Sequence, residues 1–194
     1  MISRVDINDR VREWGLREDI VEKDHVIGWI LWGIGNDSLL KSTWCFKGGT
    51  CIKKCYIETY RFSEDLDFTV TPGGPIEPAD LSPLFDRILN RVSEASGIDF
   101  AAQSPIFQKR SERLVTVGRI YYRGPRNAPG VARIKLDLSA EEIIARPTVF
   151  RDFVHPYPDE FPSPRKIRCY SFEEVFAEKI RALGERCRPR DLMM

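Results

Sequence analysis

The segment that most constrains the fold is "RFSEDLDFTV", in which apolar and polar residues alternate. In an extended strand, Leu66, Phe68 and Val70 share one face, whereas Asp65 and Asp67 share the other with α-carbons about 6.6 Å apart. A strand with one solvent face often carries charges without a function. Asp disfavours strands and like charges repel, however, so a bound cation would offset the cost of this pair.

A second alternating segment, "VARIKLDLS", places Asp137 on the polar face of another strand. If the two strands are neighbours, three carboxylates converge. Carboxylate oxygens are ligands for Mg²⁺, which usually binds one or two of them together with substrate phosphates. The sequence therefore predicts a site for Mg²⁺ (or Mn²⁺) with Asp65, Asp67 and Asp137 as metal ligands.

A glycine-rich turn, "FKGGT", precedes the Asp-x-Asp strand by one short helix. Gly48 and Gly49 let the backbone approach a ligand closely, and the following helix N-terminus attracts phosphate. Lys47 and the Thr50 hydroxyl add a charge and a hydrogen-bond donor. A glycine pair by itself is most often an ordinary turn, but its position before Asp-x-Asp favours a phosphate-binding site.

The last helix carries Lys179 inside an apolar stripe. Such a lysine often extends its amine to solvent, but lysine also binds phosphates as a point charge.

The "RIYYRGPRNAPGVARIK" segment combines basic residues with Tyr121 and Tyr122, which suits single-stranded RNA ends. A solvated loop between two strands is an equal alternative.

Periodicity elsewhere predicts one mixed α/β (α+β) domain over residues 1–194, with a sheet flanked by helices. A proline-rich stretch, "HPYPDEFPSPR", is expected to be a surface loop or a boundary before a C-terminal helical subregion from about residue 165. The expected elements are helices at 16–34, 83–97 and 172–189, a short helix in "TCIKKCYI", a short strand or its approach in "KSTWCF", and strands at 61–70, 113–122 and 131–139.

Composition narrows the class of protein. The 30 basic residues nearly balance the 29 acidic ones, so a polyanion partner must be bound by a local patch. No apolar run is long enough to span a bilayer and the start lacks signal-peptide features, so we expect a cytoplasmic protein with no membrane contact. Five cysteines form no CxxC pair, so Cys51 and Cys55, four residues apart, are expected to pack in the core rather than bind zinc.

The chain resembles the AbiEii/AbiGii-type nucleotidyltransferase toxins of the DNA polymerase β-like superfamily. The resemblance rests, in family order, on "VEKDHVIGWIL", "FKGGT", "RFSEDLDF", "IKLDLS" and "EEVFAEKIRALGERCRPRDL". It implies a minimal nucleotidyltransferase core. It also implies that Gly48, Gly49 and Thr50 hold the nucleotide triphosphate, that Lys179 contacts phosphates, and that catalysis uses Asp65, Asp67, Asp137, Lys179 and Asp191.

The same resemblance implies transfer of a nucleoside monophosphate from an NTP to an acceptor, the 3′ end of tRNA in some relatives, and a cognate antitoxin encoded nearby. Relatives commonly continue past the "RD" motif with another acidic residue, where this sequence has Met194. The C-terminus is therefore expected to be short or truncated. Two alternatives stay open: a nucleotide-binding toxin–antitoxin module without turnover, and a metal-dependent nuclease, against which the glycine turn argues.

Overall fold

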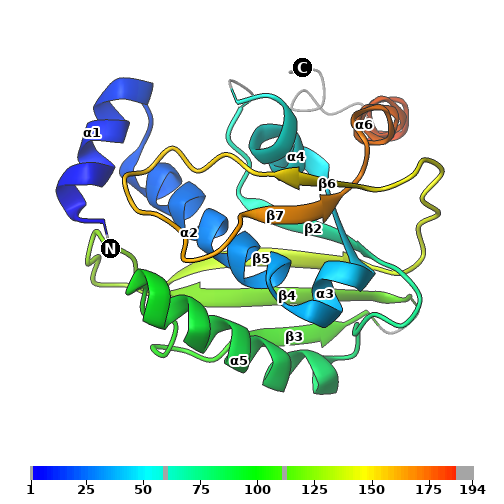
Figure 1. Ribbon diagram of the computed structural model, residues 1–194, viewed down its shortest axis with the longest axis horizontal. Helices are drawn as coiled ribbons and strands as arrows, with labels where there is room; N and C mark the ends of the chain where they lie inside the picture. Colours follow the sequence, from blue (N-terminus) through cyan, green and yellow to red (C-terminus); the bar gives the residue numbers. More distant parts are fainter. Residues whose placement is uncertain (1, 59–60, 111–112, 187–194) are drawn as a thin grey trace.

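The computed structural model describes residues 2–58, 61–110 and 113–186, in which seven strands form a single mixed sheet flanked by helices (Figure 1). The strands lie in the order β3-β4-β5-β2-β1-β7-β6. This confirms the predicted α/β fold class. The elements are α1 (Arg4–Trp14), α2 (Glu18–Gly35), α3 (Ser38–Thr43), β1 (Trp44–Lys47), α4 (Gly48–Cys51), the π-helix η1 (Ile52–Tyr56), β2 (Asp65–Val70), α5 (Pro78–Ser96), β3 (Ile106–Lys109), β4 (Val115–Tyr122), β5 (Ala132–Ser139), β6 (Val149–Asp152), β7 (Lys166–Cys169) and α6 (Phe172–Arg186).

The centre of the sheet is built from strands that are distant in sequence. β2 pairs with β1 in antiparallel orientation and with β5 in parallel orientation, so the two alternating segments are neighbours. β7 adds to the other edge of β1 as a parallel strand. Parallel neighbours need a crossover connection, and α5 lies in the one between β2 and β5.

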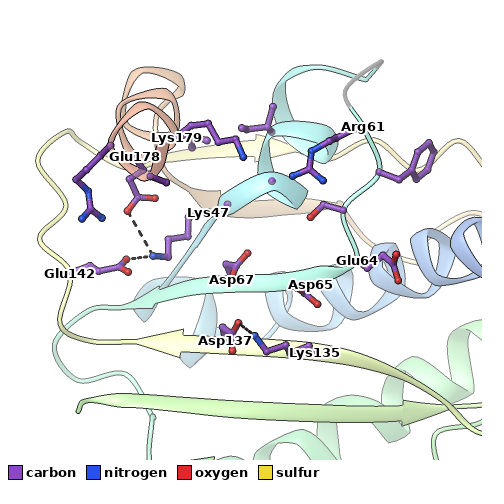
Figure 2. A pocket seen from close by; sticks show the side chains of 18 residues that line it. Lys47, Arg61, Glu64, Asp65, Asp67, Lys135, Asp137, Glu142, Glu178 and Lys179 are labelled. Carbon is purple, nitrogen blue, oxygen red and sulfur yellow. Dashed lines mark hydrogen bonds and ion pairs between the residues drawn. The ribbon is translucent and has the colours of Figure 1, made fainter. Parts of the chain in front are cut away.

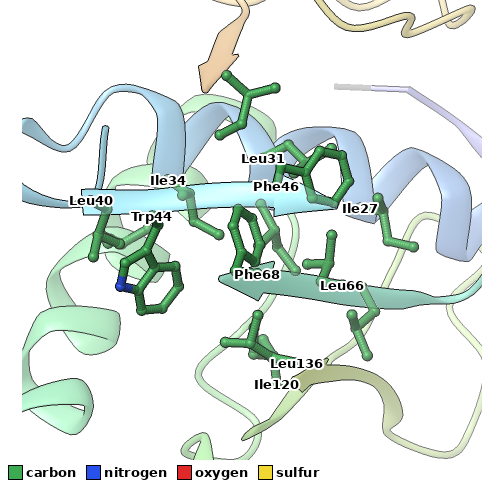
Figure 3. Packing of buried hydrophobic residues seen from close by; sticks show 14 of the residues in the cluster. Ile27, Leu31, Ile34, Leu40, Trp44, Phe46, Leu66, Phe68, Ile120 and Leu136 are labelled. Carbon is green, nitrogen blue, oxygen red and sulfur yellow. The ribbon is translucent and has the colours of Figure 1, made fainter. Parts of the chain in front are cut away.

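The apolar side chains of the central strands form the main core against α2 and α5. Figure 3 shows Phe46, Leu66 and Phe68 packed close to Ile27 and other apolar side chains, and these four residues are 0% exposed. Because side chains alternate along a strand, this packing turns the alternate residues of β2 toward the opposite face of the sheet. The hydrophobic pattern therefore fixes where the aspartates point.

The long predicted elements are confirmed, with shifted ends. The helix expected at 16–34 is α2, and the strands expected at 113–122 and 131–139 are β4 and β5. The helix expected from Pro83 begins five residues earlier, because Pro78 fits its first turn, where a missing N–H costs nothing. Only the end of "KSTWCF" lies in a strand, because Ser38–Thr43 form the helix α3, whose N-terminus is capped by the Asp37 side chain.

Other local features were missed or misjudged. The short helix after the glycine turn begins at Gly48 rather than Thr50 and continues as a π-helix. The helical subregion expected from about residue 165 begins only at Phe172, because Lys166–Cys169 form a strand of the main sheet. The helix α1 and the short strands β3, β6 and β7 were not predicted. In the described part of the chain, no helix combines the length and the apolar character that crossing a bilayer requires.

Candidate active site

A cavity of about 640 Å³ lies where β2 and β5 meet α4 and α6 (Figure 2). It brings together side chains from the glycine turn, both aspartate strands and the last helix. Six acidic and five basic residues line it, so its wall carries closely spaced charges of both signs. The charged lining residues are Lys47, Arg61, Glu64, Asp65, Asp67, Lys135, Asp137, Glu142, Glu178, Lys179 and Arg181.

The three predicted metal-binding aspartates converge on this cavity. Asp67 of β2 is the direct register partner of Asp137 of β5, and on its other side it is the register partner of Lys47 of β1. Adjacent strands lie about 4.8 Å apart, so the backbone holds these positions close together. Asp65 stands two residues earlier on the same face of β2 and pairs with Lys135. The cavity floor therefore carries three carboxylates from two neighbouring strands.

The first glycine of the turn makes room for Asp67. Gly48 has a φ of +77°, a conformation that residues with a side chain rarely adopt, and a Cβ there would lie 2.4 Å from Asp67 Oδ2. Gly49 sits below Ser63, whose Oγ would be 3.1 Å from an added Cβ. Both glycines line the cavity. The turn that contains "FKGG" thus packs directly against the strand that contains "DLD", and both motifs line one cavity.

Burial raises the pKa of three carboxyl groups that line the cavity. Burial, reinforced by the nearby charge of Asp137, raises the pKa of Asp67 to about 7. Burial likewise raises the pKa of Asp65 and of Glu178. Buried carboxylates that repel one another are the environment that a bound cation stabilises. The oxygen-only donor set suits a hard divalent ion such as Mg²⁺ or Mn²⁺, so the residues fit the metal that the sequence predicts.

Two members of the predicted triphosphate site make other contacts. The Lys47 amine donates to Glu142 Oε2 and lies 3.8 Å from Glu178 Oε1, so two carboxylates already neutralise it. Thr50 is 1% exposed and its hydroxyl donates to the backbone carbonyl of Asp65. In the structure the Thr50 hydroxyl therefore holds α4 against the start of β2, and its predicted contact with phosphate stays a prediction.

Lys179 of α6 lines the same cavity, across from the carboxylates. The structure therefore brings this predicted phosphate contact to the site, although it lies 112 residues after Asp67 in the sequence. Asp137 accepts a hydrogen bond from the Lys135 amine on its own strand. The remaining predicted catalytic residue, Asp191, lies outside the described residues.

Sequence reasoning missed Glu142 and Glu178. Glu142 Oε2 accepts hydrogen bonds from Lys47 and from the Thr69 hydroxyl at 2.9 Å, and the Tyr170 hydroxyl lies 3.5 Å away. Glu142 follows β5 in a loop, where no periodic pattern marks it. Glu178 directly precedes Lys179 in α6, so its position beside a predicted site residue could have identified it.

A second hollow, of about 750 Å³, adjoins the first. The two share Asp67, Asp137 and Arg181 among their lining residues, and the second adds Arg110 and Arg113. The basic residues beside the carboxylates thus include Lys135, from the segment predicted to suit RNA, together with Arg110 and Arg113, which were not predicted.

In the "RIYYRGPRNAPGVARIK" segment, Tyr122 is 1% exposed in the core. Arg126 donates from its backbone N–H and its Nε to the buried Glu22 carboxylate, at 2.8 and 3.1 Å. Tyr122 and Arg126 therefore stabilise the fold. The prediction that the segment presents its basic and aromatic residues to RNA is wrong for these two.

The three carboxylates lie on adjacent strands, with the glycine turn against one of them and a lysine-bearing helix opposite. This arrangement suits metal-assisted transfer of a phosphate group. The family model "Nucleotidyl transferase AbiEii toxin, Type IV TA system" matches residues 29–193. The chain therefore belongs to the AbiEii nucleotidyltransferase toxin family, as its motifs indicated.

Among solved structures, the fold is similar to MenT4, a nucleotidyltransferase toxin from Mycobacterium tuberculosis H37Rv, with a TM-score of 0.63 and 19% sequence identity. The similarity covers 100% of this chain and 63% of the MenT4 chain, so this chain spans less than two thirds of the length of that toxin. At this identity the likeness establishes the fold alone. A comparison with curated proteins found no match.

Proposed function

We propose that this protein is a Mg²⁺- or Mn²⁺-dependent nucleotidyltransferase toxin that moves a nucleoside monophosphate from an NTP to the 3′ end of tRNA. The observation that carries the proposal is the register pairing of Asp67 with Asp137, beside Asp65 and beneath Gly48. Family membership supports the same reaction class. A cognate antitoxin is the partner that a type IV toxin implies.

In this proposal Asp65, Asp67 and Asp137 hold the divalent ions, which supply charge neutralisation at the attacking and leaving oxygens. The Gly48–Gly49 turn admits the triphosphate close to the backbone. Lys179, on the opposite wall, contacts the phosphates that leave as pyrophosphate. The acceptor hydroxyl loses its proton to solvent, and its oxygen bonds to the α-phosphorus as the bond between that phosphorus and the α–β bridging oxygen breaks, which releases pyrophosphate. The protein contributes positioning and electrostatic stabilisation.

The two adjoining hollows support the proposal that each of them binds a different substrate. The first contains the glycine turn and Lys179, which suits the triphosphate. The second contains Arg110 and Arg113, which suit the phosphate backbone of an RNA acceptor. They meet at Asp67 and Asp137, where the reacting atoms would have to be. This arrangement favours an RNA acceptor over a small molecule.

The test is incubation of the protein with Mg²⁺, each α-labelled NTP in turn and total tRNA, resolved on a denaturing gel. We expect label on tRNA, and a loss of at least about 100-fold in Asp67→Asn and in Asp137→Asn, since even residues behind metal ligands cost 10–100-fold when changed. Asp152→Asn, an exposed aspartate on β6, is the matched control and should transfer normally.

Other outcomes separate the alternatives. Calorimetric NTP binding without transfer to any acceptor would replace the proposal with a nucleotide-binding toxin–antitoxin module. Degradation of RNA without added NTP would replace it with a metal-dependent nuclease. Label on protein in a cell lysate, with none on tRNA, would keep the transfer reaction and overturn the acceptor.

A further inference from the structure

Three buried cysteines from two distant parts of the chain meet behind the glycine turn. Cys51 ends α4, Cys55 follows in the π-helix η1, and Cys169 ends β7. Their Sγ atoms all lie within 4.8 Å of one another, and the residues are 0%, 5% and 0% exposed. Spacing alone offered only the pair Cys51 and Cys55. The strand β7, which sequence patterns did not predict, supplies a third sulfur.

The surroundings of the cluster favour negative charge on sulfur. The Tyr56 hydroxyl donates to the Tyr170 carbonyl and lies 3.7 Å from Cys169 Sγ, and the Arg151 guanidinium lies 4.5 Å from the centre of the Tyr56 ring. Arg151 Nε also donates to the Cys55 carbonyl at 2.8 Å, which fixes the positive charge beside the cluster. A nearby cation stabilises a thiolate, and the thiolate is the form that binds metal.

A single buried cysteine is usually just a small core residue. Three cysteines whose sulfur atoms all lie within 4.8 Å of one another differ from that case, because the sulfurs are close enough to bind one ion together.

We propose that Cys51, Cys55 and Cys169 form a binding site for a soft monovalent metal ion, Cu⁺, coordinated by three sulfurs. With metal–sulfur bonds of about 2.3 Å, planar three-coordination needs sulfurs about 4.0 Å apart, within the observed spread. Binding would release the thiol protons to solvent. Soft thiolate ligands favour Cu⁺ and Zn²⁺ over hard cations.

The number of available ligands favours Cu⁺ over Zn²⁺ at this site. Structural Zn²⁺ almost always takes four ligands. Among the described residues, no Asp, Glu, His or fourth Cys joins this group of ligand atoms, and its burial restricts the access of water. Cys187 lies outside the described residues. A three-sulfur site of this kind fits Cu⁺ better than Zn²⁺.

The site would connect three elements around the glycine turn. Cys51 directly follows Thr50 in α4, and Cys169 is the register partner of Phe46, one residue before Lys47. A metal ion shared by these cysteines would therefore fix α4 and η1 against β7. Because only the folded chain brings the three sulfurs together, the ion should bind the folded chain more tightly and raise the melting temperature.

The experiment is an anaerobic titration of the reduced, full-length protein with Cu⁺ in competition with the chromogenic chelator bathocuproine disulfonate. We expect one Cu⁺ per chain, a sulfur-to-copper charge-transfer absorption and a higher melting temperature. Cys51→Ala, Cys55→Ala and Cys169→Ala should each reduce tight binding from one ion to none. Cys45→Ala is the matched control, because Cys45 is equally buried but outside the cluster, and it should still bind one ion.

Folding is checked for every variant by circular dichroism, with Cys169→Ser replacing Cys169→Ala if the latter does not fold. The proposal is overturned if the wild-type protein retains no Cu⁺ against the chelator. It is also overturned if folded cluster variants keep the full stoichiometry, or if Cys45→Ala loses binding equally. Retention of Zn²⁺ in place of Cu⁺ would overturn the three-sulfur assignment. None of these readouts depends on nucleotidyl transfer.

Discussion

Asp67 on β2 and Asp137 on β5 are register partners in a parallel pair of strands, although 70 residues separate them in sequence. Backbone hydrogen bonding in the sheet, not the side chains themselves, keeps these two carboxyl groups together. The apolar neighbours Leu66, Phe68 and Leu136 are fully buried on the opposite face, so a shift of register by one residue would bury the acids instead. The core therefore specifies the geometry of the site.

Gly48→Ala should damage both stability and transfer. The φ of +77° makes any side chain cost about 1–2 kcal/mol, and the new Cβ would also collide with Asp67 Oδ2. Gly15→Ala is the matched control, because Gly15 has a φ of +63° with nothing within 4 Å of an added Cβ. Urea unfolding should show a loss in both variants, whereas Mg²⁺-dependent transfer should fall only in Gly48→Ala. Equal activity in the two would contradict the close fit between the turn and Asp67.

Sequence patterns were sufficient for the parts of this fold that repeat regularly. The alternation around Asp65, Asp67 and Asp137 gave both strands and their polar faces, because burial on one side of a sheet imposes a period of two. The strand β7 is only four residues long and follows a proline-rich stretch, so no period could develop. The partners of Lys47 and Thr50 depend on tertiary contacts with Glu142 and the Asp65 carbonyl, which local sequence does not encode.

The stability of the metal-free protein should fall as pH rises toward 7. The pKa of Asp67 is raised from 3.8 to about 7 in the folded state, so between these values the folded chain binds more protons than the unfolded chain. The stabilisation from the protonated carboxyl is complete below pH 3.8 and is lost as pH passes through about 7. The raised pKa of Asp65 acts in the same direction.

The variant Asp67→Asn tests this pH dependence of stability, because an amide at position 67 does not titrate. In the presence of EDTA, the variant should melt at a higher temperature than the wild type at pH 8, and the difference should shrink at pH 5. Mg²⁺ should raise the melting temperature of the wild type at pH 8 more than that of the variant. A pH-independent difference between the two proteins would show that Asp67 does not titrate in this range.

Lys47 and Glu142 should be energetically coupled. Their ion pair is 12% and 30% exposed, so removing either partner leaves a partly buried charge behind. In a double-mutant cycle with Lys47→Met and Glu142→Gln, measured by urea unfolding, we expect a coupling energy of about 1 kcal/mol. The exposed pair Lys109 and Glu77 provides the control cycle, with a smaller coupling. Additive effects at Lys47 and Glu142 would mean that Glu178 alone neutralises the lysine.

Thr50→Val should destabilise the free protein, because it leaves the Asp65 carbonyl without its hydroxyl donor at the start of β2. A lost buried hydrogen bond of this kind costs about 1–2 kcal/mol. Thr50→Ser keeps the hydroxyl and should recover most of the unfolding free energy and of the transfer activity. Urea unfolding without NTP or metal distinguishes this role from phosphate binding. If Thr50 instead donated to phosphate, Thr50→Val would leave that free energy unchanged and raise only the KM for NTP.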